Sequence, residues 1–339
     1  MKKEIRIDEL RALMLDALTL RGIGSEDAAF IVDDFLDAEL EGHKTHGVSK
    51  FLTIDIGLSG REGSIEIVSR IGGHAKIDGH RELGHIAARQ AAALSVELAK
   101  EQGVGLVALT NVSRYARLVP YSRLIAERGC IGIVTNNGGP AHVVPFGGSM
   151  PVFGTNPLSF GFPQGEKPPL IFDFATAQGV WGELRQAIVE ERPLPERTFL
   201  DAAGAFTTDP QRVLPFGGAR GAALCMALEI LTGAFVGAKM GGEIRDEYDL
   251  GYLFCALSSE MFSSTEDFIA QTAALAEAVR TSAPAAGNAQ VFVPGERSAQ
   301  RRSEQLARGT VELEADVYDR IRAMSRSREG GYENSRSMN

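Results

Sequence analysis

The chain has 339 residues, of which 44% are apolar and 23% are charged. At ~100–200 residues per domain this length predicts two or three packed units, and the composition excludes a disordered chain. The net charge of −9 argues against a nucleic-acid partner. No apolar run approaches the ~20 residues of a membrane span, and the first residues lack a secretory signal. Three scattered cysteines, Cys130, Cys225 and Cys255, indicate reduced thiols, so we expect a cytoplasmic protein.

Two amphipathic helices are predicted at the start of the chain. Apolar side chains recur at helical spacing from Leu10 to Leu18 and again from Ala28 to Leu40. Asp8 and Ser25 are the candidate N-caps, and Gly42 is the expected end of the second helix.

The middle of the chain predicts a sheet covered by helices. An alanine-rich helical pattern runs from Glu82 to Gln102, and buried strands are predicted over Val104–Thr110 and Cys130–Thr135 with a helix between them. This succession is typical of a βαβ unit and favours a largely parallel sheet. A further strand is predicted over Leu170–Phe174.

The C-terminal part predicts more helix than strand. A glycine loop, 217–221, opens an apolar helix through Phe235, and Thr265–Thr281 is helical in pattern. A strand over Gln290–Val293 and a turn at Pro294–Arg297 precede a charged helix. Residues 325–339 are polar, and we expect them to be frayed.

Glycine loop 217–221 stands at the start of a predicted helix. Exposed N–H groups and the helix dipole favour an anion there, and Arg220 adds a positive charge. A tight turn into a core helix is an equally good interpretation. The loop is not a P-loop, because the GxxxxGK spacing is missing, and it lacks the GxGxxG spacing of a Rossmann fingerprint.

Other candidate polar groups lie in predicted loops. His43 and His46 stand in a polar, glycine-terminated segment, where a histidine serves as a proton donor, a hydrogen-bonded linker or plain surface. No further ligands at zinc spacing accompany them, so no metal site is predicted. Arg114 follows a buried strand, and it is either a ligand-binding group or a solvated arginine. Asp173, at the end of a predicted strand, either orients a histidine or binds a ribose, or it is a helix cap or turn former.

Several segments together resemble one family, the type-2 malate/L-lactate dehydrogenases. Its members include ureidoglycolate and sulfolactate dehydrogenases, 2,3-diketogulonate reductase and the piperideine/pyrroline-2-carboxylate reductases. Each segment is weakly specific alone, but their order and spacing cover nearly the whole chain. They are Thr45–Gly47, Asn111–Arg114, Pro145–Gly148, Gly154–Leu158, Asp173–Thr176, Phe206–Pro210, Pro215–Gly221 and Val293–Arg297.

The resemblance implies an α/β fold with a non-Rossmann mixed sheet flanked by helices, as in sulfolactate dehydrogenase, and a helical N-terminal part. It implies a homodimer whose site lies near the subunit interface. We expect residues 1–75 and 295–339 to form a helical layer near the substrate and the dimer contact. Residues 76–294 are then the nicotinamide-binding domain.

The resemblance also implies roles for individual residues. His46 matches the proton donor, Thr45 stands where the family usually has serine, and Lys50 stands where an arginine usually contacts the substrate carboxylate. The residues that match cofactor-binding positions are Thr155, Asn156, Asp173, Phe174, Ala175, Thr176, Gly218, Arg220, Gly295, Glu296 and Arg297.

Two departures from the family pattern concern the substrate. Arg114 replaces a histidine of the active site, and an arginine with a pKa above ~12 cannot exchange protons. Lys50 keeps the positive charge of arginine without its two-pronged geometry. Our hypothesis is that Arg114 clamps the carboxylate, with Lys50 secondary and His46 as the sole proton donor. Arg220 replaces a family lysine and still suits a phosphate.

These observations predict an NAD(P)H-dependent oxidoreductase. It would transfer hydride to C2 of a 2-oxo acid or a cyclic 2-imino acid, or oxidise a 2-hydroxy acid in reverse. The expected cofactor is NADH or NADPH, the partner is a small carboxylate substrate, and neither nucleic acid nor membrane is expected. The alternative is a dimeric homologue that has lost catalysis and serves as a binding or scaffold protein.

Overall fold

The computed structural model describes residues 1–62, 64–179, 187–188, 192–194, 196–208 and 212–327. Contacts divide the chain into two compact units. Unit 1 contains Met1–Arg61, Tyr115–Arg117 and the chain from Gly295 onward, and unit 2 contains Glu62–Arg114 and Leu118–Pro294. The division therefore follows Arg61 rather than residue 75, and it assigns Tyr115–Arg117 to unit 1.

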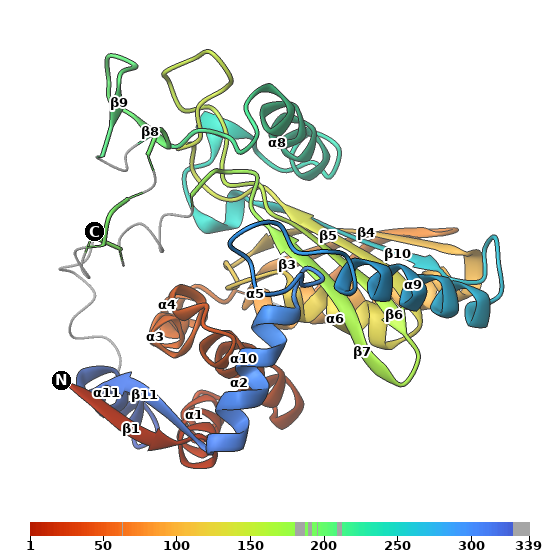
Figure 1. The fold of residues 1–339 in the computed structure, drawn as a ribbon. Coiled ribbons are helices and arrows are strands. Elements are labelled where there is room, and N and C mark those ends of the chain that lie inside the picture. Colours follow the sequence, from red (N-terminus) through yellow and green to blue (C-terminus); the bar gives the residue numbers. More distant parts are fainter. Residues whose placement is uncertain (63, 180–186, 189–191, 195, 209–211, 328–339) are drawn as a thin grey trace. The chain divides into compact units, whose positions relative to one another are not determined.

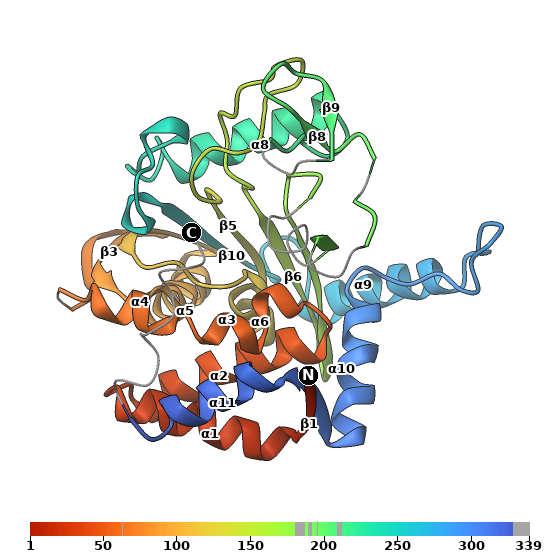
Figure 2. The same ribbon diagram turned by 90° about the vertical axis from the view of Figure 1, so that its left-hand side faces the viewer.

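Unit 1 is a helical layer in which the two ends of the described chain pair (Figure 2). Strands β1 and β11 are antiparallel, with Lys2 opposite Glu314 and Arg6 opposite Thr310. Helices α1 and α2 bury the apolar side chains that the helical spacing predicted, among them Leu10 and Ile31. Helix α11 buries Val317, Ile321 and Met324. The elements of unit 1 are β1 (Lys2–Arg6), α1 (Ile7–Leu20), α2 (Ser25–Leu40), η1 (Lys44–His46), α3 (Val48–Phe51), α4 (Ile54–Ser59), α10 (Glu296–Arg308), β11 (Thr310–Glu314) and α11 (Ala315–Met324).

The predicted caps of the first two helices are wrong. Arg6 is the N-cap of α1, and Asp8 lies inside its first turn, where Arg6 Nε donates to its carboxylate at 3.0 Å. Gly24 is the N-cap of α2, so Ser25 is already helical. Helix α2 ends at Leu40, two residues before Gly42, whose positive φ of 90° carries the chain out of the helix.

Unit 2 is built on a seven-stranded mixed sheet with the order β2-β3-β4-β10-β5-β6-β7 (Figure 1). Strands β3 and β4 are parallel and are joined by helix α5, whereas the other described neighbours in this sheet are antiparallel. The mixed sheet is therefore confirmed. Its strands are β2 (Glu66–Ile71), β3 (His74–Glu82), β4 (Val104–Val112), β5 (Cys130–Asn136), β6 (Leu158–Gln164), β7 (Lys167–Phe174) and β10 (Gly251–Ser258).

The prediction of a largely parallel sheet is wrong because β10 lies between β4 and β5. Tyr252 of β10 pairs with Leu109 on one side and with Asn136 on the other, antiparallel to both. Strand β10 comes more than 100 residues after β5 in the chain, so the local order of strands and helices around β4 and β5 could not reveal it. The strand predicted over Gln290–Val293 is also wrong, because these residues join no sheet. Of the expected frayed tail, residues 328–339 lie outside the described residues.

Helices α5 and α6 pack closely on one face of the sheet (Figure 1). Glycines in the facing strands permit this approach: a Cβ on Gly105 would stand 1.8 Å from the Ser95 carbonyl oxygen of α5. A Cβ on Gly161 would stand 2.2 Å from the Ser122 carbonyl oxygen of α6. The remaining elements of unit 2 are α5 (Gly84–Gln102), α6 (Val119–Glu127), β8 (Phe199–Leu200), β9 (Phe206–Thr207), α8 (Ala219–Thr232), η2 (Gly241–Glu243), η3 (Glu247–Asp249) and α9 (Thr265–Arg280).

Candidate active site

Loops of unit 2 that are distant in sequence interlock through backbone bridges. Val143 pairs with Phe153 and with Val213, and Ala177 pairs with Pro215. Val143, Phe153, Phe199 and Val213 share a buried apolar cluster beneath these bridges. The bridges therefore join three of the sequence segments that we expected to bind the cofactor.

The buried side chain of Asn156 hydrogen-bonds to the loop at Gly138 and to helix α8. Its side chain is fully buried, and its backbone has a positive φ of 41°. Gly138 N donates to its Oδ1 at 3.0 Å, while its Nδ2 donates to Glu229 Oε2 at 2.7 Å and to the Cys225 carbonyl at 2.9 Å. Because the amide is fully engaged, Asn156 shapes the loop rather than presenting its side chain to a ligand.

Thr155 and Thr176 connect two of the predicted cofactor segments. The backbone N and the Oγ1 of Thr176 both donate to the Thr155 carbonyl, at 3.0 and 2.9 Å. Phe216 N donates in turn to the Thr176 carbonyl at 2.9 Å, and the ring of Phe174 meets that of Phe216 edge to face. Asp173 and Phe174 are exposed at the end of β7, and Ala175 is half-buried beside them.

The glycine loop leads directly into helix α8, as predicted. Gly217 and Gly218 both have positive φ, 61° and 64°, and Gly218 is the N-cap. A Cβ on Gly217 would have open space around it, and Arg220 is exposed in the first turn of the helix. Free N–H groups at a helix start, a guanidinium and open space make this loop chemically suited to an anion.

Arg114 is held at the end of β4 by its neighbours in the Asn111–Arg114 segment. Asn111 Nδ2 donates to Asp78 Oδ1 at 2.8 Å, and the buried Ser113 Oγ accepts from Gly84 N at 3.0 Å. Arg114 N itself donates to Glu247 Oε2 at 3.2 Å. Its guanidinium lies against Gly139, where a Cβ would stand 2.5 Å from Nη2. Arg114 therefore lies beside the loop that Gly138 ties to Asn156.

The histidine segment of unit 1 is shaped by contact with helix α2. A Cβ on Gly47 would stand 2.2 Å from Glu39 Oε2, so glycine is required there. Val48 N donates to the same oxygen at 3.1 Å. Burial raises the pKa of Glu39, and this hydrogen bond opposes the rise. Lys50 is exposed on α3, and Thr45 is half-buried.

The start of α10 lies beside this histidine segment. His43 Nε2 and Ser298 Oγ are 3.2 Å apart. Gly295, with a φ of 88°, is the N-cap of α10, and Glu296 and Arg297 form its first turn. The structure thus brings two predicted site segments of unit 1, the histidine segment and Gly295–Arg297, close together.

His46 is neutral at physiological pH in this structure. Burial, with added repulsion from Arg117, His43 and Lys50, lowers its pKa to about 4. Its Nδ1 is buried and has no hydrogen-bond partner among the described residues. A neutral imidazole suits the acceptance of a proton, and a nearby anion would raise the pKa toward the donor range.

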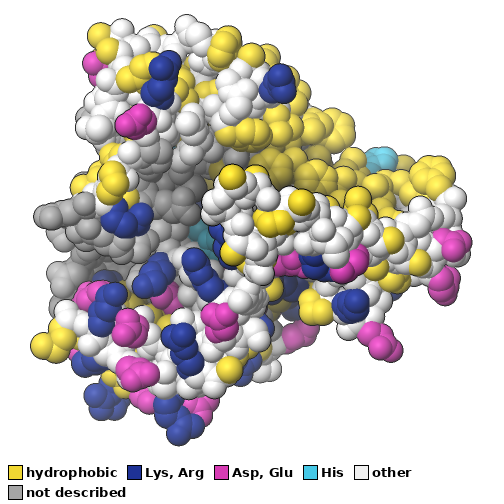
Figure 3. Space-filling model, viewed as in Figure 1, with side chains coloured by type: hydrophobic (Ala, Val, Ile, Leu, Met, Phe, Trp, Pro, Cys, Tyr) yellow, Lys and Arg dark blue, Asp and Glu magenta, His cyan; other side chains and the backbone are white. Residues whose placement is uncertain are grey.

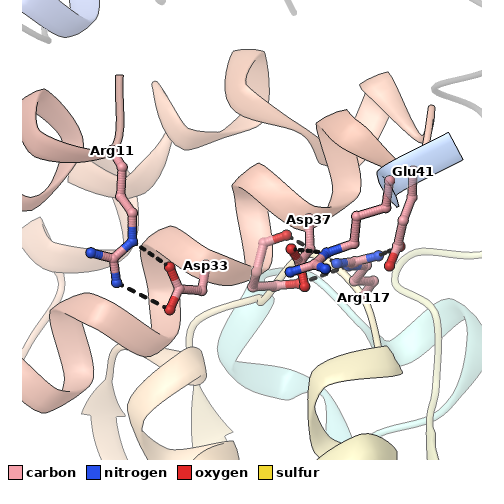
Figure 4. A network of polar contacts seen from close by, with 7 residues as sticks. Arg11, Asp33, Asp37, Glu41 and Arg117 are labelled. Carbon is pink, nitrogen blue, oxygen red and sulfur yellow. Dashed lines mark hydrogen bonds and ion pairs between the residues drawn. The ribbon is translucent and has the colours of Figure 1, made fainter. Parts of the chain in front are cut away.

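Arg117 is a buried residue of unit 1 that the sequence did not indicate as important (Figure 4). Its Nε donates to Asp34 Oδ1 at 2.7 Å, its Nη2 donates to the Asp34 carbonyl at 3.0 Å, and its Nη1 binds Glu41. Burial alone would lower the pKa of Arg117, but the two carboxylates raise it, so the guanidinium stays charged. The sequence gives no signal for this role, because Arg117 differs from a surface arginine only in its contacts with Asp34 and Glu41, which are distant along the chain.

Among the described residues, no group of three or more histidine, cysteine or acidic side chains is arranged to hold a metal ion. No described helix is both long enough and apolar enough to cross a membrane.

Comparison with known proteins identifies the family. The malate/L-lactate dehydrogenase family profile matches residues 5–322. The L-sulfolactate dehydrogenase of Methanocaldococcus jannaschii is 32% identical over 326 residues, which cover 92% of this chain and 93% of that protein. The solved structure of sulfolactate dehydrogenase from that organism superposes with a TM-score of 0.87 at 30% identity, covering 96% of this chain and 97% of that one.

Two further relatives have different activities in their names. Delta(1)-pyrroline-2-carboxylate reductase 2 of Burkholderia multivorans is 31% identical over 255 residues, 71% of this chain and 74% of that protein. The NAD(+) ureidoglycolate dehydrogenase of Escherichia coli K12 is 27% identical over 329 residues, 93% of this chain and 94% of that protein. The expected family and fold are confirmed: this chain belongs to the malate/L-lactate dehydrogenase family and is an oxidoreductase.

Proposed function

We propose that the protein is an NAD(P)H-dependent reductase that transfers hydride to C2 of a 2-oxo acid or a cyclic 2-imino acid. The reverse reaction oxidises the corresponding 2-hydroxy or 2-amino acid. The family membership supports the reaction type, and the names of relatives include both a hydroxy-acid dehydrogenase and a cyclic imino acid reductase.

The observation that carries the proposal is the position of Arg114. Its guanidinium lies against Gly139, in the loop that Asn156 and Thr155 tie to the proposed cofactor segments. A guanidinium binds a carboxylate through two parallel hydrogen bonds, which orients a substrate as well as attracting it. We assign the substrate carboxylate to Arg114, with Lys50 as a secondary positive charge.

His46 is the proposed proton-transfer group, and we propose that Thr45 helps to set its hydrogen bonding once ligands are bound. In the free protein its lowered pKa keeps it neutral, which suits a base for the oxidation direction. During reduction, the bound carboxylate would offset the positive charges that lower this pKa and so help His46 to donate.

The residues present fit a nicotinamide dinucleotide. Gly217 and Gly218, the start of α8 and the exposed Arg220 suit its phosphates, and the interlocked Thr155–Thr176 segments lie beside that helix start. We extend the proposed cofactor contacts to Asp173–Ala175 and, in unit 1, to Gly295–Arg297. When bound, the nicotinamide supplies or accepts the hydride.

We also propose a homodimer in the cytoplasm. Helix α8 exposes Met226 and Ile230 to solvent, Phe235 is exposed three residues after the helix ends, and apolar side chains gather around α8 in Figure 3. An apolar patch on a soluble protein marks an interaction surface, and a second copy would cover it. The three cysteines are unpaired, in keeping with a reducing compartment.

Calorimetric titration of the purified protein with NADH, and separately with NADPH, tests the proposal. Saturable binding of one, followed by its oxidation in the presence of 2-oxo acids or cyclic imino acids, is the expected result. A folded protein that binds neither would overturn the reductase and favour a homologue that has lost catalysis. Size-exclusion chromatography with light scattering tests the dimer, and a monomeric mass would contradict it.

A further inference from the structure

A further histidine, His142, belongs to the loop that the Arg114 guanidinium meets at Gly139, and it has no role in the proposal above. It stands in the loop between β5 and β6, three residues after Gly139. Its backbone N donates to the Phe153 carbonyl at 2.9 Å, and its carbonyl accepts from Val213 N at 2.9 Å. Because both backbone groups are engaged, the loop holds the imidazole in a defined position.

The hydrogen bonding of the ring fixes which nitrogen carries the proton. His142 Nδ1 lies 2.9 Å from the Pro140 carbonyl oxygen. A carbonyl oxygen only accepts, so Nδ1 is the N–H donor, and in the neutral ring Nε2 has a lone pair. Nε2 is buried and has no hydrogen-bond partner among the described residues. A buried acceptor left unpaired is unfavourable, and a ligand that enters the loop with a donor hydrogen would relieve it.

The surroundings keep this ring neutral. Burial lowers the pKa of His142, the Pro140 hydrogen bond opposes this effect, and the positive charge of Arg114 lowers the pKa further. At neutral pH the side chain therefore presents an acceptor at Nε2, next to a guanidinium that presents only donors. A ligand that satisfies both groups needs a carboxylate and, close to it, a hydrogen-bond donor.

We propose that His142 Nε2 accepts a hydrogen bond from the heteroatom on C2 of the substrate whose carboxylate Arg114 binds. The inference rests on the proposed function and specifies its substrate class. A protonated cyclic imino acid carries N–H at that position and keeps it when hydride is added to C2. The single O–H proton of a 2-hydroxy acid is instead the one that His46 removes. The carbonyl oxygen of a 2-oxo acid only accepts, and it would face the lone pair of Nε2. Cyclic imino acids are therefore preferred over 2-oxo acids for reduction.

Steady-state kinetics with three probes test this inference. The probes are piperideine-2-carboxylate and pyruvate with the reduced coenzyme, and L-malate with the oxidised coenzyme. His142→Asn keeps a donor toward the Pro140 carbonyl but loses the acceptor at the Nε2 position, whereas His142→Gln can place an amide oxygen there. His74→Gln is the matched control, because His74 is exposed and pairs near Leu106, at the opposite end of β4 from Arg114.

The expected result is a rise of about tenfold in KM for the imino acid in His142→Asn, which corresponds to the loss of one buried hydrogen bond. His142→Gln should return this KM to within about threefold of wild type. The KM values for pyruvate and L-malate should not rise in His142→Asn, and coenzyme affinity should stay unchanged.

Three outcomes would overturn the inference in distinguishable ways. Equal KM changes for pyruvate and for the imino acid, or no change in His142→Asn, would remove the role of His142 and leave the proposed reductase intact. Turnover of pyruvate or L-malate without turnover of the imino acid would remove the preference for imino acids and leave the oxidoreductase. Coenzyme binding without turnover of any 2-oxo, 2-imino or 2-hydroxy acid would remove the proposed function, and the inference with it.

Discussion

Arg117 and Asp34 form a buried ion pair, with Nε and Oδ1 2.7 Å apart and side chains only 5% and 1% exposed. This pair fixes the short segment Tyr115–Arg117 of unit 1 to helix α2. The residues on either side of that segment, Arg114 and Leu118, belong to unit 2. The ion pair therefore anchors the three residues over which the chain leaves unit 2, joins unit 1 and then continues in unit 2.

Arg117→Ala should lower the free energy of unfolding by about 3–5 kcal/mol, because it leaves the buried Asp34 and Glu41 without their counter-charge. Arg11→Ala is the matched control, since Arg11 binds Asp33 of the same helix at 2.8 Å with both side chains exposed (Figure 4). The control should lose less than about 1 kcal/mol. Urea denaturation of both variants measures the difference, and equal losses would contradict a special role for Arg117.

Gly47→Ala should displace the histidine segment, because its Cβ would stand 2.2 Å from Glu39 Oε2 and 3.1 Å from Glu39 Cα. We expect a loss of about 1–3 kcal/mol in stability and a fall in kcat/KM of about 10²-fold as His46 shifts. Gly24→Ala, with nothing within 4 Å of the added Cβ, is the control. Wild-type activity in Gly47→Ala would show that the segment tolerates the displacement.

His46 should make stability depend on pH in the acid range. Its pKa is lowered on folding from 6.5 to about 4, so the unfolded chain binds more protons between these values. Its contribution to stability is present above pH 6.5 and is lost as the pH falls toward 4, by up to about 3 kcal/mol. His46→Asn should show a shallower fall in denaturation midpoint between pH 7 and 4.5 than wild type, whereas His74→Asn should not differ.

Arg114 and Arg220 should affect different ligands. Arg114→Ala removes the proposed carboxylate clamp and should raise substrate KM by about 10–100-fold while coenzyme affinity stays within about twofold. Arg220→Ala should weaken coenzyme binding by about tenfold and leave substrate KM near wild type at saturating coenzyme. Steady-state kinetics paired with coenzyme titration separate the two. If Arg114→Ala instead weakens coenzyme binding, the assignment is wrong.

Much of the fold was predictable because its signals are local. The helical spacing in α2 and the glycine that ends α5 depend on neighbouring residues alone, and the structure places both elements within two residues of the prediction. The same holds for β4, β5 and β7, whose apolar runs match their bounds within a few residues. The family was identifiable for a related reason, since the order of short segments along the chain needs no knowledge of contacts.

The candidate site was predictable as segments but not as a set of contacts. Thr155, Thr176 and Gly218 stand in segments that the sequence motifs identified, and backbone and side-chain hydrogen bonds join these segments in the structure. The side-chain amide of Asn156, in contrast, is fully hydrogen-bonded to Gly138, Cys225 and Glu229, and the sequence could not show these contacts. Its role follows from burial, and burial depends on the whole fold.

The sequence by itself determined the long helices, three of the seven strands of the sheet, the glycine turns and the family, because spacing and backbone preference act over a few residues. Only the tertiary structure decided that β10 separates β4 from β5, that Arg117 is buried against α2, and that His142 Nε2 is buried without a hydrogen-bond partner among the described residues. Each of these depends on residues distant along the chain, whose meeting is set by packing and by the pairing of buried polar groups.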